Sequence, residues 1–271
     1  MAYNKYYLQK KQVSYDNGLT WEDVTPSETR QGAYIDSYDT LEECEAIDYS
    51  TQYLTFVAEA DNMSVSLSYA NSNVYQYSVD GGQTWSNLAN SGSTTSVNSG
   101  ETIMFKASGL TVSSSDGIGT LNPSVSASVQ GNIMSLVYGD NFTGQTTISD
   151  YQFKYLFSSC LHIISIENLI LPATTLANNC YEHMFSYLSR ITTAPELPAA
   201  TLTDYCYHLM FYRCTSLNYI KCLATDISAS DCTKSWLSNV ASTGTFVKDA
   251  NTTWTTGVSG IPDGWTVQNN S

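Results

Sequence analysis

Residues 171–176 read LPATTL, and residues 197–202 read LPAATL. The second copy begins 26 positions after the first (197 − 171). The same step of 26 positions links further residues: Cys180, Cys206 and Cys232, and Met184, Met210 and Trp236. An earlier copy occupies residues 156–160, which makes about four copies between residues 148 and 248. Self-similarity at such a period indicates a solenoid, a chain that stacks copies of one unit. We name each copy a rung.

Apolar side chains recur within each rung, as at Cys180, Met184, Phe185 and Leu188. Positions i, i+4, i+5 and i+8 lie on one face of a helix, so the pattern predicts a short buried helix in each rung. Segments typical of strands follow each helix, namely residues 163–167, 191–195, 217–221 and 245–248. A single rung could not bury its apolar stripe alone, so the rungs are expected to stack.

Two segments carry a resemblance to a known family: residues 207–217, YHLMFYRCTSL, and residues 194–199, APELPA. The stretch resembles the BspA-type leucine-rich repeats of anaerobic gut bacteria and their phages, over roughly the C-terminal half of the chain. The resemblance implies a leucine-rich-repeat solenoid and a surface-displayed binding or adhesion module, and it supplies no catalytic residues. The third copy departs from the pattern, because Ser228 stands where Leu176 and Leu202 predict leucine. The repeats are also few, so any concave surface is expected to be small.

The N-terminal half has the pattern of antiparallel β-structure. Short alternating runs such as residues 64–69 and 102–107 are separated by Gly, Asn, Asp and Ser clusters, at the spacing of a β-sandwich. The sequence therefore predicts a mixed α+β chain with three parts: a small β unit at residues 1–47, a β-sandwich at 48–140, and a leucine-rich-repeat α/β solenoid with a C-terminal β cap at 141–271. Residues 133–138 are the expected N-terminal cap of the solenoid, and residues 254–267 the hairpin that closes its far end.

The composition excludes some partners. The 271 residues carry a formal net charge of −14, and the 11 Lys and Arg are scattered. Nucleic-acid backbones and anionic membranes are recognised by basic patches, so neither is an expected partner. Residues 1–11 contain no apolar core of a signal peptide, and no run approaches the length of a membrane span. We therefore expect a protein displayed on a virion or cell surface, and the missing signal favours the virion.

The repeat also bears on the 7 cysteines. Cys180, Cys206 and Cys232 would lie on successive helices whose axes are ~8–10 Å apart. A disulfide requires Cα atoms within about 7 Å, so we expect a buried ladder of free thiols. The residues expected to form this structural core ladder are Cys180, Cys206, Cys232, Met184, Met210 and Trp236. Cys44 lies outside the repeats and is the thiol that we expect to be exposed.

One local motif, S-x-D-x-G-x-T-W, occurs at residues 14–21 and 78–85. It resembles the Asp-box of sialidases and other carbohydrate-active proteins. Its residues have structural roles in a turn, since Asp caps turn amides, Gly takes positive φ and Trp packs beneath the hairpin. Two copies are too few for a propeller, so we interpret them as hairpins. The expected structural residues are Asp16, Gly18, Trp21, Asp80, Gly82 and Trp85.

A metal or catalytic site is not indicated. Cysteine and histidine are close in sequence at Cys180 and His183 and at Cys206 and His208, a spacing that zinc sites use. However, a step of 26 from His183 reaches Leu209, so the histidines are out of register and are interpreted as surface residues. We predict no metal, no cofactor and no catalytic residue.

Two surface features of the rungs could bind a ligand. Tyrosines recur through the rungs, and tyrosine offers a large amphipathic contact area. On the strand face, an exposed column is expected. Its candidate binding residues are Ser165, Glu167, Thr193, Tyr219, Lys221 and Thr245.

The predicted function is that of a non-enzymatic binding, adhesion or structural protein, virion-associated as a fibre or decoration protein, that recognises a host or surface ligand through its repeats. The expected partner is a protein or a surface polysaccharide, with other virion proteins and a homo-oligomer left open. Two alternatives remain. One is a bacterial cell-surface leucine-rich-repeat adhesin, and the other is a carbohydrate-binding or carbohydrate-active protein.

Overall fold

The computed structural model describes residues 11–13, 22–24, 47–68, 74–108, 112 and 117–270. The chain divides into two compact units, Met1–Asp48 and Tyr49–Ser271. In the first unit, β1 (Lys11–Val13) pairs antiparallel with β2 (Glu22–Val24), as the sequence predicts. The turn between them lies outside the described residues, and so do Asp16, Gly18, Trp21 and Cys44.

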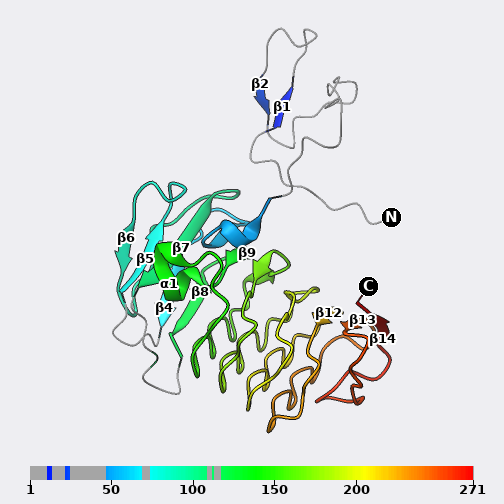
Figure 1. The fold of residues 1–271 in the computed structure, drawn as a ribbon. Coiled ribbons are helices and arrows are strands. Elements are labelled where there is room, and N and C mark those ends of the chain that lie inside the picture. The colour runs from blue at the N-terminus through cyan, green and yellow to red at the C-terminus, as the bar shows by residue number, and fades with distance from the viewer. Residues whose placement is uncertain are drawn as a thin grey trace. The chain divides into compact units, whose positions relative to one another are not determined.

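The second unit is mostly β-sheet with few helices (Figure 1). Its first part contains η1 (Tyr49–Thr51), β3 (Leu54–Ala58), β4 (Val65–Ser68), β5 (Val74–Ser78), β6 (Ser86–Leu88), β7 (Thr102–Ser108), β8 (Thr120–Pro123), β9 (Ala127–Asn132), α1 (Ser135–Tyr138) and η2 (Gly139–Asn141). The main sheet has the order β10-β9-β3-β7-β5-β6, and β4 and β8 form a separate pair. The expected antiparallel β-structure is present, because β3 pairs antiparallel with both β7 and β9.

One predicted strand of this part was wrong. The sequence pattern also predicts a strand at residues 94–97, but these residues form one isolated bridge, Met63↔Val97. The sequence analysis missed β6 and β8. Pro123 reads as a breaker but ends β8 in register with Val65, a position that proline tolerates because it is the last residue of an edge strand.

The rungs follow from about residue 148, and each begins with a turn segment: residues 151–160, 179–188, 205–214 and 231–240. Backbone amides in these segments alternate between two directions. Phe185 N donates to Met210 O of the next rung at 2.9 Å, whereas Met184 N donates back to Tyr181 O at 3.1 Å. Every fourth residue takes positive φ, as His183 does at 57°.

The helices that the sequence predicts in these segments were therefore wrong. Residues 151–240 contain consecutive turns joined to the neighbouring rung by backbone hydrogen bonds, and no helix forms among them. An α-helix would use every amide within its own segment, which would leave no bond between rungs. The residues with left-handed backbone let every second amide point to the next rung instead. Figure 1 shows the resulting parallel loops lying side by side.

The other side of the rungs carries short parallel strands. They are β10 (Ile163–Ser165), β11 (Leu169–Ile170), β12 (Tyr219–Cys222), β13 (Thr245–Lys248) and β14 (Thr266–Asn269). The strand predicted at 191–195 is reduced to one parallel bridge, Thr193↔Tyr219. The expected C-terminal hairpin was wrong, because β14 pairs parallel with β13. Residues 266–269 therefore continue the stack of rungs.

Stacked side chains fill the interior of the rungs. Phe185 packs between Phe157 and Phe211 with ring centroids 5.8 and 5.3 Å apart and nearly parallel planes. Trp236 is stacked between Tyr207 and Trp254 at 6.0 and 5.5 Å. All six residues of the structural core ladder are buried: Cys180, Cys206, Cys232, Met184, Met210 and Trp236. The described cysteines are all free and buried.

The first rung is covered by the β-sheet. Leu121 N of β8 donates to Leu156 O at 3.0 Å, and Ala127 N of β9 donates to His162 O at 3.0 Å. Strands β10 and β11 extend this contact by pairing parallel with β9. Strand β9 thus pairs with β3, which precedes residue 140 in the sequence, and with β10 and β11, which follow it. The domain boundary expected at residue 140 stays a prediction. The expected cap at 133–138 contributes a bond from Ile133 N to Ile170 O at 3.2 Å and another from Tyr138 Oη to Thr147 O at 2.8 Å.

Candidate functional site

The turn segments expose columns of side chains that run across the rungs. Residues with positive φ recur at equivalent positions of successive rungs. Tyr155, His183 and Leu209 each donate their amide to a carbonyl of the next rung, and so do Ser159, Tyr187 and Arg213. One column contains Tyr155, His183, Leu209 and Ser235, and another contains Ser159, Tyr187, Arg213 and Asn239. We name this side of the rungs the turn face. Its chemistry is set by residues that the fold directs outward at every fourth position.

Two rings of the first column, those of Tyr155 and His183, meet the ring of His208 in the next rung. The rings of Tyr155 and His183 are stacked with centroids 5.0 Å apart. His208 lies edge-on to His183 at 5.9 Å and edge-on to Tyr205 at 5.5 Å. Burial lowers the pKa of His183 below its usual value. Neutral imidazole is therefore the favoured form of His183 near neutral pH, and its ring serves as an aromatic surface.

Two residues of the second column, Tyr187 and Arg213, meet Tyr212, which precedes Arg213 in the chain. The rings of Tyr187 and Tyr212 are perpendicular, with centroids 5.5 Å apart. The guanidinium of Arg213 lies 5.6 Å from the Tyr187 ring and 5.5 Å from the Tyr212 ring, and its Nε donates to Tyr212 Oη at 3.1 Å. Tyr187 is 39% exposed. Cation–π contacts of this kind hold a guanidinium in place without neutralising its charge.

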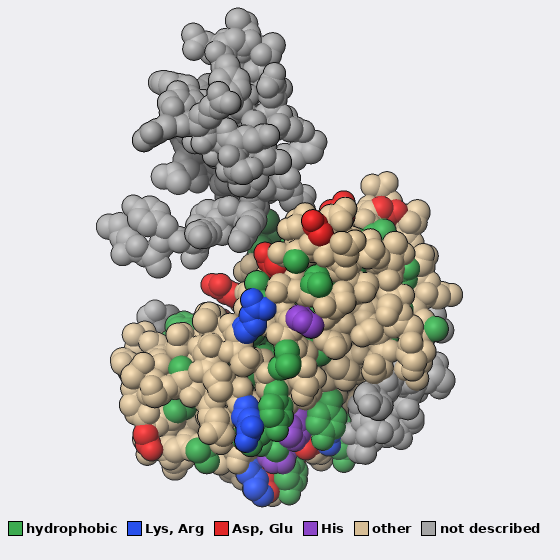
Figure 2. Space-filling model, turned by 180° about the vertical axis from the view of Figure 1, so that it is seen from behind, with side chains coloured by type: hydrophobic (Ala, Val, Ile, Leu, Met, Phe, Trp, Pro, Cys, Tyr) green, Lys and Arg blue, Asp and Glu red, His purple; other side chains and the backbone are tan. Residues whose placement is uncertain are grey.

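We name these six residues the aromatic–basic surface: Tyr155, His183, Tyr187, His208, Tyr212 and Arg213. Figure 2 shows basic, histidine and hydrophobic side chains gathered in the lower part of the view, with acidic side chains among them, on a surface made mostly of other side chains and backbone.

A network of polar groups holds the aromatic–basic surface from beneath. Glu182 accepts from Lys154 Nζ at 2.7 Å and from Asn179 Nδ2 at 2.7 Å, and its other oxygen lies 3.2 Å from His208 Nδ1. Burial opposes ionisation of Glu182, but these hydrogen bonds and the charge of Lys154 outweigh it and lower the pKa of the carboxyl. The carboxylate therefore stays charged and fixes His208 beside His183.

The candidate residues on the strand face lie elsewhere. Thr193, Tyr219 and Thr245 share a column, since Thr193 bridges Tyr219 and Tyr219 pairs with Thr245. The three residues are thus aligned across the rungs, Thr193 and Thr245 are half-buried, and their role in binding stays a prediction. Ser165 pairs in the other direction, with Ser128 of β9.

The charged candidates of the strand face give it little free charge. Lys221 forms an ion pair with Glu196, with nitrogen and oxygen 2.9 Å apart. Glu167 is exposed on the loop after β10. Tyr219 is 36% exposed and is the large aromatic group of this face. The strand face therefore presents one tyrosine, hydroxyls, the carboxylate of Glu167 and a neutralised pair.

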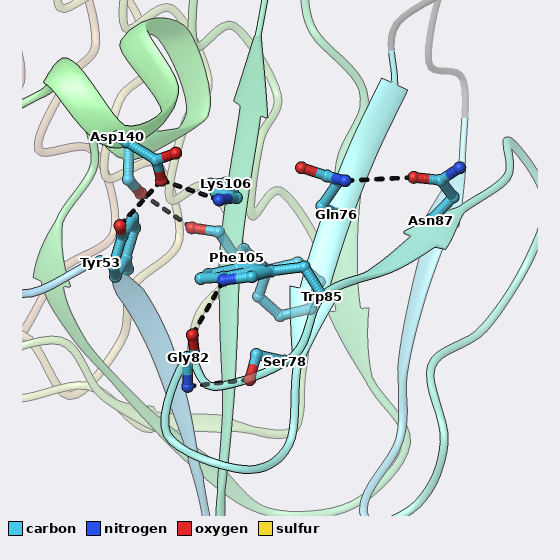
Figure 3. A network of polar contacts seen from close by, with 10 residues as sticks. Tyr53, Gln76, Ser78, Gly82, Trp85, Asn87, Phe105, Lys106 and Asp140 are labelled. Atoms are coloured by element: carbon cyan, nitrogen blue, oxygen red, sulfur yellow. Dashed lines mark hydrogen bonds and ion pairs between the residues drawn. The ribbon is translucent and has the colours of Figure 1, made fainter.

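The second Asp-box motif forms the turn between β5 and β6. Asp80 accepts from Ser78 Oγ at 2.7 Å and from Thr84 N and Oγ1 at 2.9 and 2.6 Å, and these bonds lower the pKa of its carboxyl to about 2. Gly82 has φ of 87°, and Trp85 Nε1 donates to Gly82 O at 3.1 Å (Figure 3). The bonds agree with the structural interpretation of Asp80, Gly82 and Trp85.

Lys106 ties this hairpin to the sheet. Its Nζ lies 4.2 Å from the Trp85 ring centroid and 2.8 Å from Asp140 Oδ1, which also accepts from Tyr53 Oη at 2.8 Å (Figure 3). The lysine side chain is 13% exposed. Each polar group faces a partner within the protein, so the arrangement stabilises the hairpin and does not offer a charge to a ligand.

The described residues hold no group of three or more His, Cys, Asp or Glu placed to bind a metal ion. His162 Nδ1 lies 3.1 Å from Pro123 O, away from the other histidines. Burial raises the pKa of the described thiols, to about 12 for Cys160, which makes them poor nucleophiles. In the same part of the chain, no helix is long and apolar enough to cross a bilayer.

The sequence-based interpretation noted the recurring tyrosines and the surface histidines of the rungs but placed the candidate binding residues on the strand face. It did not bring Tyr187, Tyr212 and Arg213 together, because it treated the turn segments as helices. The sequence does contain a signal for these turns, because the buried residues Cys180, Met184 and Leu188 recur at a period of four. The residue that precedes each of them lies on the turn face. A search of the chain against protein-family models, curated protein sequences and solved structures found no match.

Proposed function

We propose that this chain is a non-enzymatic recognition protein, displayed on a virion or a cell surface, that binds a surface ligand through its rungs. In this proposal the rungs are a short leucine-rich-repeat solenoid of BspA type, with turns in place of the usual helices. The observation that carries the proposal is the aromatic–basic surface, where rings from adjacent rungs lie 5.0 to 5.9 Å apart on a surface held rigid by the stack beneath. Rigid aromatic groups bind with little loss of conformational entropy.

The chemistry of the site favours binding over catalysis. A general acid or base needs a pKa near the working pH, and the carboxyl of Glu182 is shifted the other way. The described cysteines are buried, so they do not serve as nucleophiles. Tyrosine, histidine and arginine are instead the residue types that supply contact area and hydrogen bonds in recognition surfaces.

A polysaccharide is the ligand class that we favour over a protein. A standard protein–protein interface buries about 800 Å² on each partner around an apolar centre. The turn face offers instead a narrow line of rings edged by polar serines, such as Ser159 and Ser238. A line of rings that crosses successive rungs suits an extended chain. Display on a virion rather than a cell is proposed from the composition of the chain, which is rich in Ser, Thr, Asn and Tyr.

The test is binding of the labelled, intact protein to whole bacterial cells, before and after treatment of the cells with periodate or protease. Periodate oxidises sugar diols, so the proposal expects binding to fall after periodate and to survive protease. Binding that is lost after protease alone would identify a protein ligand and overturn the choice of polysaccharide. An absence of binding to any gut-bacterial cell tested would overturn the recognition role.

A further inference from the structure

We infer that Arg213 binds a carboxylate, and hence that the ligand of the turn face is a glycan containing an acidic sugar. The inference rests on the proposed function, because it names the ligand class of the same surface. It commits to isolated carboxylates within a mainly neutral sugar chain. The observations that lead to it are the state of the arginine, the charge around it and the rings beside it.

The guanidinium of Arg213 is held in place and has N–H donors available to bind an anion. Its Nε is used by Tyr212, and within the described part of the chain it forms no ion pair with Asp or Glu. The four N–H donors at the end of the guanidinium form the planar fork that matches a carboxylate in a bidentate geometry. The rings of Tyr187 and Tyr212 restrict the side chain, which reduces the entropy lost on binding.

Two other cations of the turn face are already paired. Lys154 is bound to Glu182 and Lys234 to Asp231, at 2.7 and 2.9 Å. Among the described residues of this face, these pairs leave Arg213 as the cation whose charge is available to a ligand. A single available cation in a chain of net charge −14 favours a ligand with sparse negative charge over a dense polyanion, which the protein as a whole would repel.

The rings next to Arg213 indicate a sugar as the carrier of that carboxylate. Tyr187 occupies the position equivalent to Arg213 in the preceding rung, and its ring is exposed beside the guanidinium. The C–H face of a pyranose packs on an aromatic ring while its hydroxyls bond to polar neighbours. A uronic acid or a related acidic sugar combines both requirements, since its ring would pack on Tyr187 as its carboxylate met Arg213.

The test compares two forms of one ligand. The polysaccharide fraction is extracted from cells that the wild-type protein binds, and half of it is treated to reduce its carboxyl groups to alcohols. Binding of both halves is measured by calorimetry or biolayer interferometry for the wild type and for Arg213→Ala, Arg213→Lys and Arg190→Ala. Arg190→Ala is the matched control, because it removes the same charge from an arginine that donates to Ser126 in the β part.

The expected result is that the wild type binds the reduced polysaccharide at least about tenfold more weakly than the native one. Arg213→Ala should bind both halves equally, at the weaker level, while Arg190→Ala keeps the wild-type preference. Arg213→Lys should keep only part of the preference, because an ammonium lacks the planar fork. Equal binding of native and reduced polysaccharide by the wild type would overturn this inference and leave the proposed function standing. Failure to bind either half, with cell binding unaffected by periodate, would overturn both.

Discussion

Replacing Ser159 with alanine or with glycine tests the turn geometry of the rungs. Ser159 is exposed, has φ of 60°, and donates its amide to Ser186 O of the next rung at 2.9 Å. The left-handed conformation costs a residue with a Cβ about 1–2 kcal/mol. Glycine avoids that cost but loses about 0.5–1 kcal/mol more backbone entropy on folding. We therefore expect Ser159→Gly to be more stable than Ser159→Ala by about 1 kcal/mol.

The sign of this difference decides between turn and helix. In a helix interior, alanine would be the more stable variant by about 1 kcal/mol. The assay is urea unfolding followed by tryptophan fluorescence, with the midpoint compared at equal slope. Ala200→Gly is the control, because Ala200 is exposed and lacks positive φ, so glycine should destabilise there. A Ser159→Ala variant that is more stable than Ser159→Gly would refute the stacked-turn interpretation.

Three further predictions follow from the described contacts. Trp236→Ala should destabilise the protein by about 3–5 kcal/mol, because the ring is fully buried between Tyr207 and Trp254, and a fall in melting temperature below 3 °C would contradict this. In a Cys44→Ser background, the six described thiols should resist Ellman's reagent until the protein unfolds, since burial raises their pKa; rapid native modification would contradict the closed core. Asp80 has its pKa lowered to about 2 from 3.8, so its contribution to stability is present above pH 4 and lost as the pH falls towards 2. Asp80→Asn should flatten the pH dependence of the urea midpoint in that window, and an unchanged profile would argue against the turn role of Asp80.

The repeat made much of the rung interior predictable. A fixed step of 26 placed Cys180, Cys206 and Cys232 in equivalent positions, and stacking of such positions needs no knowledge of the local backbone. The structure buries all three. The antiparallel strands β3 and β7 were predictable for a similar reason, because alternation at Ile103 and Phe105 identifies a half-buried strand.

The turn segments were not predictable by the usual rules. Positions i, i+4 and i+8 fit a helix over two turns almost as well as they fit a period of four. Left-handed backbone is also rare for residues such as Tyr187, Leu209 and Arg213, so propensity argues against it. Hydrogen bonds between rungs decide the conformation, and in the first three turn segments they join residues 25 or 27 positions apart, as Phe185 and Met210 or Ser159 and Ser186.

The candidate surface was missed for the same reason. A helix would direct Tyr187 and Arg213 according to a period of 3.6, whereas the turns direct every fourth residue outward. The strand face, which the sequence favoured, holds Lys221 in an ion pair with Glu196 that no local pattern indicates. Ion pairs between loops depend on how the chain folds, so they cannot be predicted from neighbouring residues in the sequence.

The most direct test of the account compares two matched double variants in the cell-binding assay. Tyr187→Ser with Arg213→Ser removes one tyrosine and one positive charge from the turn face, and Tyr219→Ser with Lys221→Ser removes the same groups from the strand face. The two tyrosines are similarly exposed, at 39% and 36%. We predict that the turn-face variant loses binding at least tenfold while the strand-face variant binds like the wild type. Loss of binding by the strand-face variant alone would contradict the account and indicate that the ligand binds the strand face.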